Sequence, residues 1–243
     1  MKAMILAAGR GERMRPLTDS VPKPLLEAGG KPLLVWHVEK LVAAGVNDIV
    51  INHSHLGHMI EAALGDGQSF GAKIRYSPEP VALDTAGGVA NARRMLGDAP
   101  FLLISGDIWS DYEYPQLVRV ARDMKREGGA HARLAHQILS ASREAPPYDY
   151  THIESQRVRM RAMPSSPAED APGARYDVYS GIGVFRPLLF AEIASGARAP
   201  LLPLLLKASA LGLSSAERSA RDFANLTTPA DLAELDRRLQ SLK

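Results

Sequence analysis

Hydrophobic and polar positions follow two different spacings along the first half of the chain. Short apolar runs are separated by stretches in which apolar residues recur every three or four positions. The runs predict buried strands and the spaced stretches predict helices, which together indicate a mostly parallel sheet covered by helices. The predicted strands are 4–8, 48–52, 73–77 and 101–105, and the predicted helices are one from Leu33 that ends at Gly45 and others at about 56–64, 86–96 and 114–127.

The pattern changes after about residue 134. Residues 135–175 combine several prolines, mixed charge and weak periodicity, which predict long loops around one or two strands. A strand is predicted again at 176–185. Its centre reads SGIG at 180–183, and glycines there indicate a bend or a close approach of another backbone.

The C-terminal segment carries the signals of a helix start. Thr228, Pro229 and Asp231 match an N-cap, a proline at the first helical position and a capping-box acid. A leucine stripe follows and predicts a helix that docks on the domain, to which we give no catalytic role. The stripe consists of Leu232, Leu235, Leu239 and Leu242.

Composition narrows the class of protein without identifying a function. With 243 residues, 46% of them hydrophobic and 23% charged, and a net charge of +2, the chain has the profile of an ordinary globular protein. The absence of cysteine excludes disulfides, thiolate zinc sites and cysteine nucleophiles. The opening residues match neither a transmembrane span nor a signal peptide. We expect a cytoplasmic monomer or small homo-oligomer with no nucleic-acid or membrane partner.

Small and basic residues gather directly after the first predicted strand. Ala8, Gly9 and Gly11 leave room for backbone N–H groups to turn toward phosphate oxygens. Arg13 can add a bidentate guanidinium contact, and Lys23 a mobile positive charge. On spacing alone a tight turn explains the Gly-x-Gly equally well, and the string is neither a Walker loop nor a complete dinucleotide fingerprint.

Longer sequence motifs make the interpretation of this loop more specific. The words are LAAGRGERMRPLT at 6–18, PKPLL at 22–26, Glu79 followed by DTAGG at 84–88, SGD ending in Asp107, and SGIG at 180–183. In this order they resemble the sugar-1-phosphate nucleotidyltransferases, most strongly from residue 1 to about 115. The words INH, LDTAGG and GDIW look most like the N-acetylmuramate α-1-phosphate uridylyltransferases of peptidoglycan recycling, with mannose-1-phosphate guanylyltransferase as the nearest alternative.

The resemblance implies one nucleotidyltransferase domain over 1–243 with a Rossmann-like α/β fold: a mixed, mostly parallel sheet flanked by helices, without a C-terminal left-handed β-helix. Residues 1–130 would form the nucleotide-binding half, and 131–243 the sugar-binding half with the C-terminal helix. The implied substrates are an NTP, with UTP expected, and a sugar 1-phosphate, with Mg²⁺ as cofactor. The sugar phosphate would attack the α phosphorus and release pyrophosphate, without a general base because a phosphate monoester is largely a dianion at neutral pH.

The resemblance also implies roles for individual residues. Arg13 would contact the β and γ phosphates, Lys23 the α phosphate or the sugar phosphate, and Asp107 would bind Mg²⁺, so these three are the expected catalytic residues. Glu79 and Thr85 fall where the family reads the base, although a surface acid in a turn would look the same as Glu79. The other expected nucleotide contacts are Leu6, Ala8, Gly9, Arg10, Gly11 and Gly106.

Two departures from the family pattern affect this interpretation. Family members place a second metal-binding aspartate in the word Trp-x-Asp-x-Gly-Thr-Pro, and Asn225 occupies its place here. An asparagine carbonyl can coordinate Mg²⁺ but adds no negative charge, so we expect weaker metal binding. An Asn-Pro and His-Pro-x-Gly-Asp-Phe segment expected near 137–150 is absent, which leaves the sugar open. Both departures support a second hypothesis, a regulatory nucleotide-binding protein with weak or no catalysis.

Two further interpretations are disfavoured. A dinucleotide-dependent oxidoreductase would need a complete Gly-x-Gly-x-x-Gly after the first strand and would leave Arg13 and Lys23 without a role. His53, His55 and His58 lie close together in the sequence, but they fall at a strand-to-helix connection rather than in a zinc-binding pattern.

Overall fold

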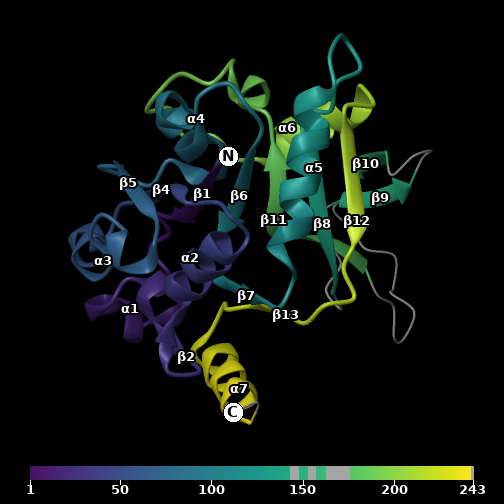
Figure 1. The fold of residues 1–243 in the computed structure, drawn as a ribbon. Helices are drawn as coiled ribbons and strands as arrows, with labels where there is room; N and C mark the ends of the chain where they lie inside the picture. Colours follow the sequence, from purple (N-terminus) through teal and green to yellow (C-terminus); the bar gives the residue numbers. More distant parts are fainter. Residues whose placement is uncertain (143–147, 153–156, 163–175, 242–243) are drawn as a thin grey trace.

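A computed structural model of the protein describes residues 1–142, 148–152, 157–162 and 176–241. Its centre is a seven-stranded sheet in the order β12-β8-β11-β6-β1-β4-β5 (Figure 1). Strand β11 is antiparallel to both of its neighbours and the other pairs are parallel. The bounds are β1 Lys2–Ala7, β4 Asp48–His53, β5 Lys73–Pro78, β6 Phe101–Ser105, β8 Ala135–Ser142, β11 Tyr176–Phe185 and β12 Ser214–Arg218. The predicted mixed, mostly parallel sheet is confirmed.

Helices cover both faces of this sheet. Helices α2 Leu33–Ala43, α3 Gly57–Leu64 and α5 Tyr114–Arg126 pack on one face, and α4 Asp84–Leu96 and α6 Leu202–Ala210 pack on the other. Strand side chains alternate between the two layers, as Ile5 in one core and Met4 in the other show. The four strands and four helices predicted in the first half are therefore present, with ends that differ by one or two residues.

The region predicted as long loops contains more strand than expected. Besides β8, the strands β9 Tyr148–His152 and β10 Val158–Ala162 form an antiparallel pair, so three strands lie where one or two were predicted. The sequence pattern did not place strand β8, because this strand buries polar side chains and so lacks a continuous apolar run. His136 contacts the Ser215 hydroxyl at 2.8 Å, and Gln137 donates to the Ser214 hydroxyl at 3.0 Å. The rest of the predicted loop lies outside the described residues.

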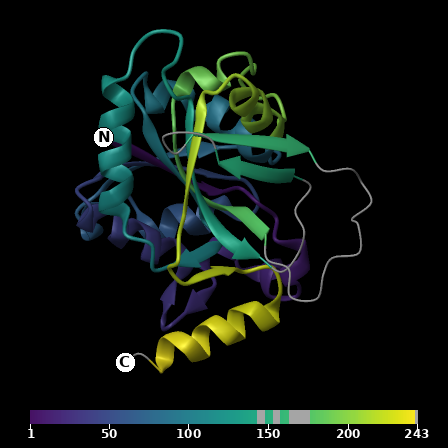
Figure 2. The same ribbon diagram turned by 90° about the vertical axis from the view of Figure 1, so that its right-hand side faces the viewer.

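A small two-stranded ribbon and the last helix lie at the bottom of the molecule as drawn in Figure 2. Strand β7 Ile108–Ser110 pairs antiparallel with β13 Phe223–Asn225, and α7 Pro229–Gln240 packs beside them. The capping box of Thr228 and Asp231 is present, as predicted. Leu235 and Leu239 are buried, so the docking face is confirmed, whereas Leu242 lies outside the described residues.

Short elements complete the fold. They are the strands β2 Glu27–Ala28 and β3 Lys31–Pro32, the helix α1 Leu17–Ser20, and the 3₁₀ turns Glu12–Met14, Lys23–Leu25, Gln68–Phe70 and Pro187–Phe190. Across the part of the chain that the structure describes, no helix combines the length and apolar character needed to cross a membrane.

Candidate active site

A cleft opens at the carboxyl ends of β1, β4 and β6. The parallel register places Leu6 beside both Asn52 and Ser105, so the ends of three strands reach the same level. This edge of a parallel sheet is where α/β proteins bind ligands. An inner hollow is lined by Leu6, Ala7, Ala8, Gly9, Lys23, Pro24, Asn52, Ala82, Asp84, Thr85, Ser105 and Asp107. An adjoining outer hollow is lined by Gly9, Gly11, Glu12, Arg13, Lys23, Asp107 and Thr227.

Glycines shape the floor of the cleft. Gly106 donates its N–H to the Leu6 carbonyl at 2.8 Å, and a Cβ at this position would lie 2.8 Å from the same oxygen. Gly181 has a φ of 80° and faces Ser105, with a register shift in β11 nearby. The bend predicted at SGIG is therefore present. Close approach at Gly106 brings Asp107 to the end of β1 and into both hollows.

The predicted phosphate-binding loop presents one free guanidinium and one that is occupied. Arg13 is exposed on the outer hollow and forms no ion pair with any residue that the structure describes. Arg10 instead donates to the Thr18 carbonyl at 2.6 Å and to Asp19 at 3.1 Å. It does not line either hollow, so its role at the nucleotide stays a prediction. Gly11 holds a left-handed φ of 69° close to the Lys23 side chain.

Lys23 and Asp107 meet where the two hollows join. The Lys23 Nζ lies 2.6 Å from the Asp107 Oδ2, although the residues are 84 positions apart in the chain. The Lys23 side chain is 10% exposed and that of Asp107 is 42% exposed. The buried stem therefore fixes the ammonium in place, while the carboxylate remains accessible from the cleft.

The strand that carries Asn225 runs directly beside Asp107. In the β7–β13 ribbon Asn225 is paired with Ile108, and Leu226 donates its N–H to the Asp107 carbonyl at 3.3 Å. Sequence reasoning expected these two residues to share a metal site, and the structure brings their segments together across 118 positions. A carboxylate and an amide are the oxygen donors that Mg²⁺ accepts, so the residues present fit this cation.

Two residues of α2 that sequence reasoning missed support this ribbon. His37 donates from Nε2 to the Ile108 carbonyl at 2.9 Å and accepts from the Tyr114 hydroxyl at Nδ1 at 2.8 Å. Because a carbonyl only accepts, this arrangement fixes the neutral tautomer. Burial lowers the pKa of His37 to about 4. Lys40 donates to the Ser110 carbonyl at 2.5 Å, and burial lowers its pKa to about 8.

The far end of the inner hollow rests on a buried hydrogen-bond chain. The Asn52 amide accepts from the Ala7 N–H at 3.0 Å and donates to Glu79 at 2.7 Å. The second Glu79 oxygen accepts from the Leu83 N–H at 2.8 Å. Glu79 is 3% exposed and lies behind Asn52, outside the lining of the hollow. Of the two predicted base readers, Thr85 lines the hollow and Glu79 does not.

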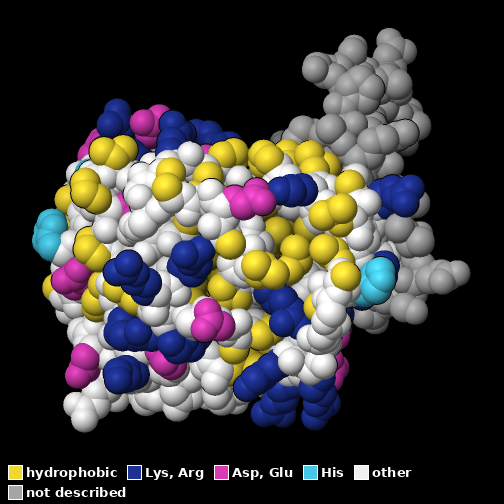
Figure 3. Space-filling model, turned by 90° about the horizontal axis from the view of Figure 1, so that it is seen from above, with side chains coloured by type: hydrophobic (Ala, Val, Ile, Leu, Met, Phe, Trp, Pro, Cys, Tyr) yellow, Lys and Arg dark blue, Asp and Glu magenta, His cyan; other side chains and the backbone are white. Residues whose placement is uncertain are grey.

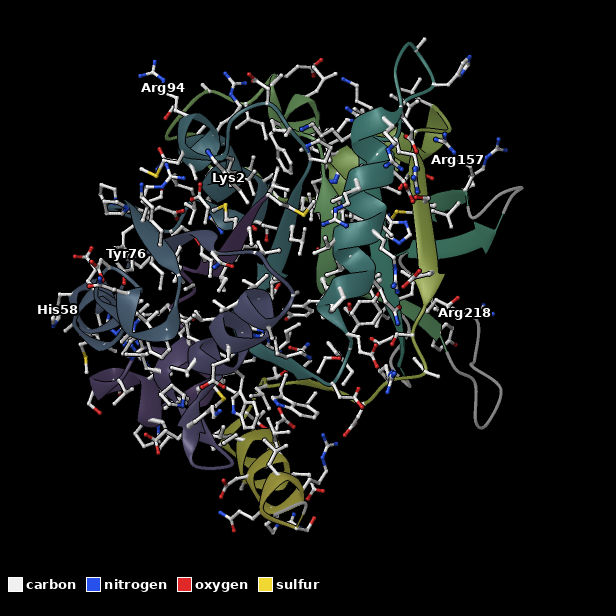
Figure 4. The ribbon with its side chains drawn as sticks, in the orientation of Figure 1. Lys2, His58, Tyr76, Arg94, Arg157 and Arg218 are labelled. Carbon is white, nitrogen blue, oxygen red and sulfur yellow. The ribbon has the colours of Figure 1, made fainter. Side chains whose placement is uncertain are left out.

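Two of the three clustered histidines have structural partners, and the third points away from them. His53 contacts Glu61 at 2.7 Å, and His55 contacts the Thr18 carbonyl at 3.2 Å. His58 points outward from α3 (Figure 4). Within the described ranges no group of three or more His, Asp or Glu side chains is placed to hold a metal.

Positive charge is spread over the surface rather than confined to the cleft. Figure 3 views the molecule from above, on the side where the parallel strands begin, and Lys and Arg side chains are scattered over this face among apolar ones. The excess of basic residues therefore does not locate the site, whereas the Lys23–Asp107 pair and Arg13 do.

Comparisons with known proteins agree with this geometry. The family model of nucleotidyl transferases matches residues 2–198. An N-acetylmuramate alpha-1-phosphate uridylyltransferase of Neisseria meningitidis serogroup B is 44% identical over 210 residues, which is 84% of each chain. The chain therefore belongs to the sugar-1-phosphate nucleotidyltransferase family, as its resemblance predicted.

Other relatives are matched over a smaller share or only in fold. A mannose-1-phosphate guanyltransferase of Gibberella zeae is 41% identical over 131 residues, which is 53% of this chain and 36% of that protein. A crystal structure described as a glucose-1-phosphate thymidylyltransferase from Bacillus anthracis has a TM-score of 0.82 at 21% identity, covering 100% of this chain and 96% of that one. This last likeness confirms the fold.

Proposed function

We propose that the protein transfers a uridylyl group from UTP to N-acetylmuramic acid α-1-phosphate, releasing pyrophosphate and forming a UDP-sugar for peptidoglycan recycling in the cytoplasm. The observation that carries the choice of substrates is the 44% identity to the Neisseria uridylyltransferase, which extends over 84% of both chains. The cleft supports the reaction, because its inner hollow adjoins an outer hollow in which the Arg13 and Lys23 cations lie on the same wall as the Asp107 carboxylate.

Positioning and charge neutralisation are the main tasks in this reaction. The sugar phosphate is already largely a dianion at neutral pH, so its oxygen can attack the α phosphorus without a general base. No histidine belongs to the described lining of either hollow, consistent with this route. The new P–O bond forms as the bond to pyrophosphate breaks, and the departing group carries the electron pair away.

The two cations of the cleft would act on different phosphates. Lys23, fixed by its buried stem and by Asp107, holds its charge at the junction of the hollows, where the α phosphate would lie. Arg13 is free to contact the β and γ phosphates from the outer hollow. A fixed cation needs no reorganisation as charge develops, which lowers the barrier.

Asp107 and Asn225 are the residues that would hold Mg²⁺. A bound Mg²⁺ would screen the charge of the phosphates and polarise the phosphorus that is attacked. The protein part of this site is the β7–β13 ribbon, which His37 and Lys40 of α2 hold through the carbonyls of Ile108 and Ser110.

The first experiment is pyrophosphate release with UTP, GTP and dTTP, each paired with the 1-phosphates of N-acetylmuramic acid, mannose and glucose. We expect turnover with UTP and N-acetylmuramic acid α-1-phosphate. Turnover with GTP and mannose 1-phosphate instead would establish the second candidate, which the Gibberella relative supports.

The same assay tests the regulatory alternative that Asn225 raises. Nucleotide binding without turnover in the natural chain, together with turnover in Asn225→Asp, would identify a binding protein with an incomplete metal site. Turnover in the natural chain would exclude that alternative.

A further inference from the structure

The last helix, α7, packs against a cluster that contains both tryptophans of the chain. Trp36 of α2 and Trp109 of β7 meet edge to face, with 6.5 Å between their ring centres. They share an apolar cluster with two buried leucines of α7. Trp109 lies in the β7–β13 ribbon, two residues after Asp107. The cluster therefore connects the helix to the strand pair that brings Asp107 and Asn225 together.

The far end of α7 is fixed to the turn between β2 and β3. Asp236 accepts the Gly29 N–H at 2.8 Å, and the Trp36 indole donates to the Ala28 carbonyl at 3.0 Å. Gly29 has a left-handed φ of 63°, and a Cβ at this position would lie 2.8 Å from the Cβ of Leu239 and 3.3 Å from a ring carbon of Trp36. The helix can therefore lie this close to the turn only because residue 29 is a glycine.

A side chain of α7 also holds the segment that leads into β13. The Arg238 guanidinium pairs with Asp222, with 2.9 Å between Nη2 and Oδ2, and it lies 5.9 Å from the ring centre of Trp109. The Asp222 carbonyl accepts the Ser110 hydroxyl at 2.8 Å. The start of β13 is thus bound both to the helix and to β7.

The first turn of α7 holds the segment that follows β13. The Asp231 carboxylate accepts the N–H groups of Thr227 and Thr228 at 2.8 and 2.7 Å, and Thr227 lines the outer hollow together with Lys23. Burial favours the neutral acid, but these N–H groups and the Lys23 charge outweigh it and hold the pKa of Asp231 below its ordinary value. The helix therefore begins within electrostatic range of the cation in the cleft.

The ribbon that carries Asn225 depends on such support. Strands β7 and β13 have three residues each and form a sheet of their own. A two-stranded pair of this kind is at best marginally stable in water. His37 and Lys40 bind carbonyls of β7, whereas the contacts of α7 hold the chain on both sides of β13. The position of Asn225 relative to Asp107 is therefore set largely from α7.

We propose that α7 positions Asn225 beside Asp107, so that docking of this helix sets how strongly the cleft binds Mg²⁺ together with an NTP. The inference rests on the proposed function, because it needs the NTP and the cation in the cleft. Gly29, Trp36 and Arg238 are positioning residues, since none of them belongs to the described lining of either hollow. A helix for which the sequence pattern predicts docking alone thus contributes to binding.

Gly29→Ala and Gly45→Ala form a matched pair of variants. Both glycines have a left-handed φ, of 63° and 77°, but the added Cβ meets Leu239 at residue 29 and nothing within 4 Å at residue 45. Both variants therefore carry backbone strain, and only Gly29→Ala displaces α7. In titration calorimetry without sugar phosphate, Gly29→Ala should bind UTP at least fivefold more weakly than the natural chain in saturating Mg²⁺ and equally well in EDTA. Gly45→Ala should match the natural chain in both solutions.

Arg238→Gln tests the same link without a steric clash. It removes the pair with Asp222 at a side chain that is 36% exposed, so the chain should fold. Arg237→Gln is the control, because Arg237 pairs with Glu234 of the same helix. Tryptophan fluorescence during a Mg²⁺ titration at fixed UTP gives the half-saturating Mg²⁺ concentration without turnover, because coupling between two sites is reciprocal. This concentration should rise at least threefold in Arg238→Gln and stay unchanged in Arg237→Gln.

Several results would overturn the inference. They are natural Mg²⁺ dependence in Gly29→Ala or Arg238→Gln, a fluorescence that does not respond to Mg²⁺, and a loss of UTP affinity in Gly29→Ala that is as large in EDTA as in Mg²⁺. If Gly29→Ala does not fold, Arg238→Gln decides. UTP binding by the natural chain that is independent of Mg²⁺ would remove the cation from Asp107 and Asn225, and the inference with it. Failure of the natural chain to bind UTP in either solution would instead overturn the proposed function.

Discussion

The two ends of the cleft are built on different principles. At the proposed phosphate end, Arg13 is exposed and forms no ion pair within the part of the chain that the structure describes, and the Lys23–Asp107 pair is partly open to solvent. At the nucleoside end, Asn52 and Glu79 belong to a buried chain of hydrogen bonds that ties two strands and a loop together. The phosphate end can therefore act on a ligand through its charges, and the nucleoside end through its fixed shape. Substitutions at the first should therefore change turnover, and substitutions at the second should change both affinity and stability.

The largest effect is expected at Lys23. Lys23→Met keeps the buried stem and removes the ammonium, so kcat for pyrophosphate release should fall by about 10²–10³. The free energy of unfolding should change by less than about 1 kcal/mol, because Asp107 is 42% exposed and stays solvated. Lys207→Met, which removes a surface pair with Glu192, is the control and should leave kcat unchanged. Retention of more than a tenth of the natural kcat in Lys23→Met would contradict this account of the phosphate end.

The floor beneath the phosphate end is expected to be sensitive to pH. His37 has a pKa of about 4 in the folded protein against 6.5 for its ordinary value. The unfolded chain therefore binds a proton that the folded chain does not, and stability is lost as the pH falls from about 6.5 toward 4. The loss from this one residue should reach about 3 kcal/mol, at 1.36 kcal/mol for each unit of pKa.

Urea unfolding at pH 7, 6, 5 and 4 measures this loss. His37→Gln should flatten the decline, whereas His58→Gln, at an exposed position, should follow the natural curve. Identical curves for the natural chain and His37→Gln would mean that the β7–β13 ribbon does not depend on a neutral His37.

At the nucleoside end a single added methyl group should be enough to disturb the buried hydrogen bonds between Asn52 and Glu79. The Cβ of Gly88→Ala would lie 2.7 Å from the Asn52 amide nitrogen and 2.8 Å from a Glu79 oxygen. Breaking this buried contact should cost about 1–3 kcal/mol of unfolding free energy and weaken UTP binding. Helix propensity alone predicts the opposite sign, a gain of about 1 kcal/mol.

The control for Gly88→Ala is Gly128→Ala, because nothing lies within 4 Å of its Cβ and its φ is not in the left-handed region. Unfolding and calorimetric titration of both variants measure the difference. A Gly88→Ala protein that is more stable than the natural chain and binds UTP equally well would show that the nucleoside end is not rigid.

The two ends of the cleft also differ in how far their residues can be predicted from the sequence. Lys23 and Asp107 belong to recognisable sequence motifs, and Asp107 also follows the end of β6, so the sequence predicts that both lie in the cleft, and the structure brings them together. Asn52 and Glu79 are 27 positions apart, and no local pattern signals a contact between them. The left-handed backbone of Asp84, which lines the inner hollow, cannot be read from residue type, because aspartate adopts it only when the surrounding fold requires it.

The same reasoning applies to the fold. The strands β1, β4, β5 and β6 coincide with the apolar runs of the first half, so the hydrophobic pattern predicts them correctly. Strand β8 instead buries His136 and Gln137, whose partners Ser214 and Ser215 come almost 80 residues later in β12. Satisfied polar groups are tolerated in a core, yet they remove the hydrophobic signal on which the prediction of strands depends. Strand β8 and the Asn52–Glu79 contact were therefore not predicted for the same reason: both depend on polar contacts between segments that are distant in the sequence.

The smallest expected effect concerns the metal at the phosphate end. Asn225→Asp restores a negative charge beside Asp107, in the strand paired with Ile108. Cation affinity rises with the number of charged ligands, so the half-saturating Mg²⁺ concentration for pyrophosphate release should fall about tenfold, equivalent to about 1.4 kcal/mol. Asn47→Asp adds the same charge at an exposed position beside Gly71 and should leave the Mg²⁺ dependence unchanged. Equal Mg²⁺ dependence in the natural chain and Asn225→Asp would mean that Asp107 alone determines the affinity, and that the phosphate end reaches its full charge without the second strand.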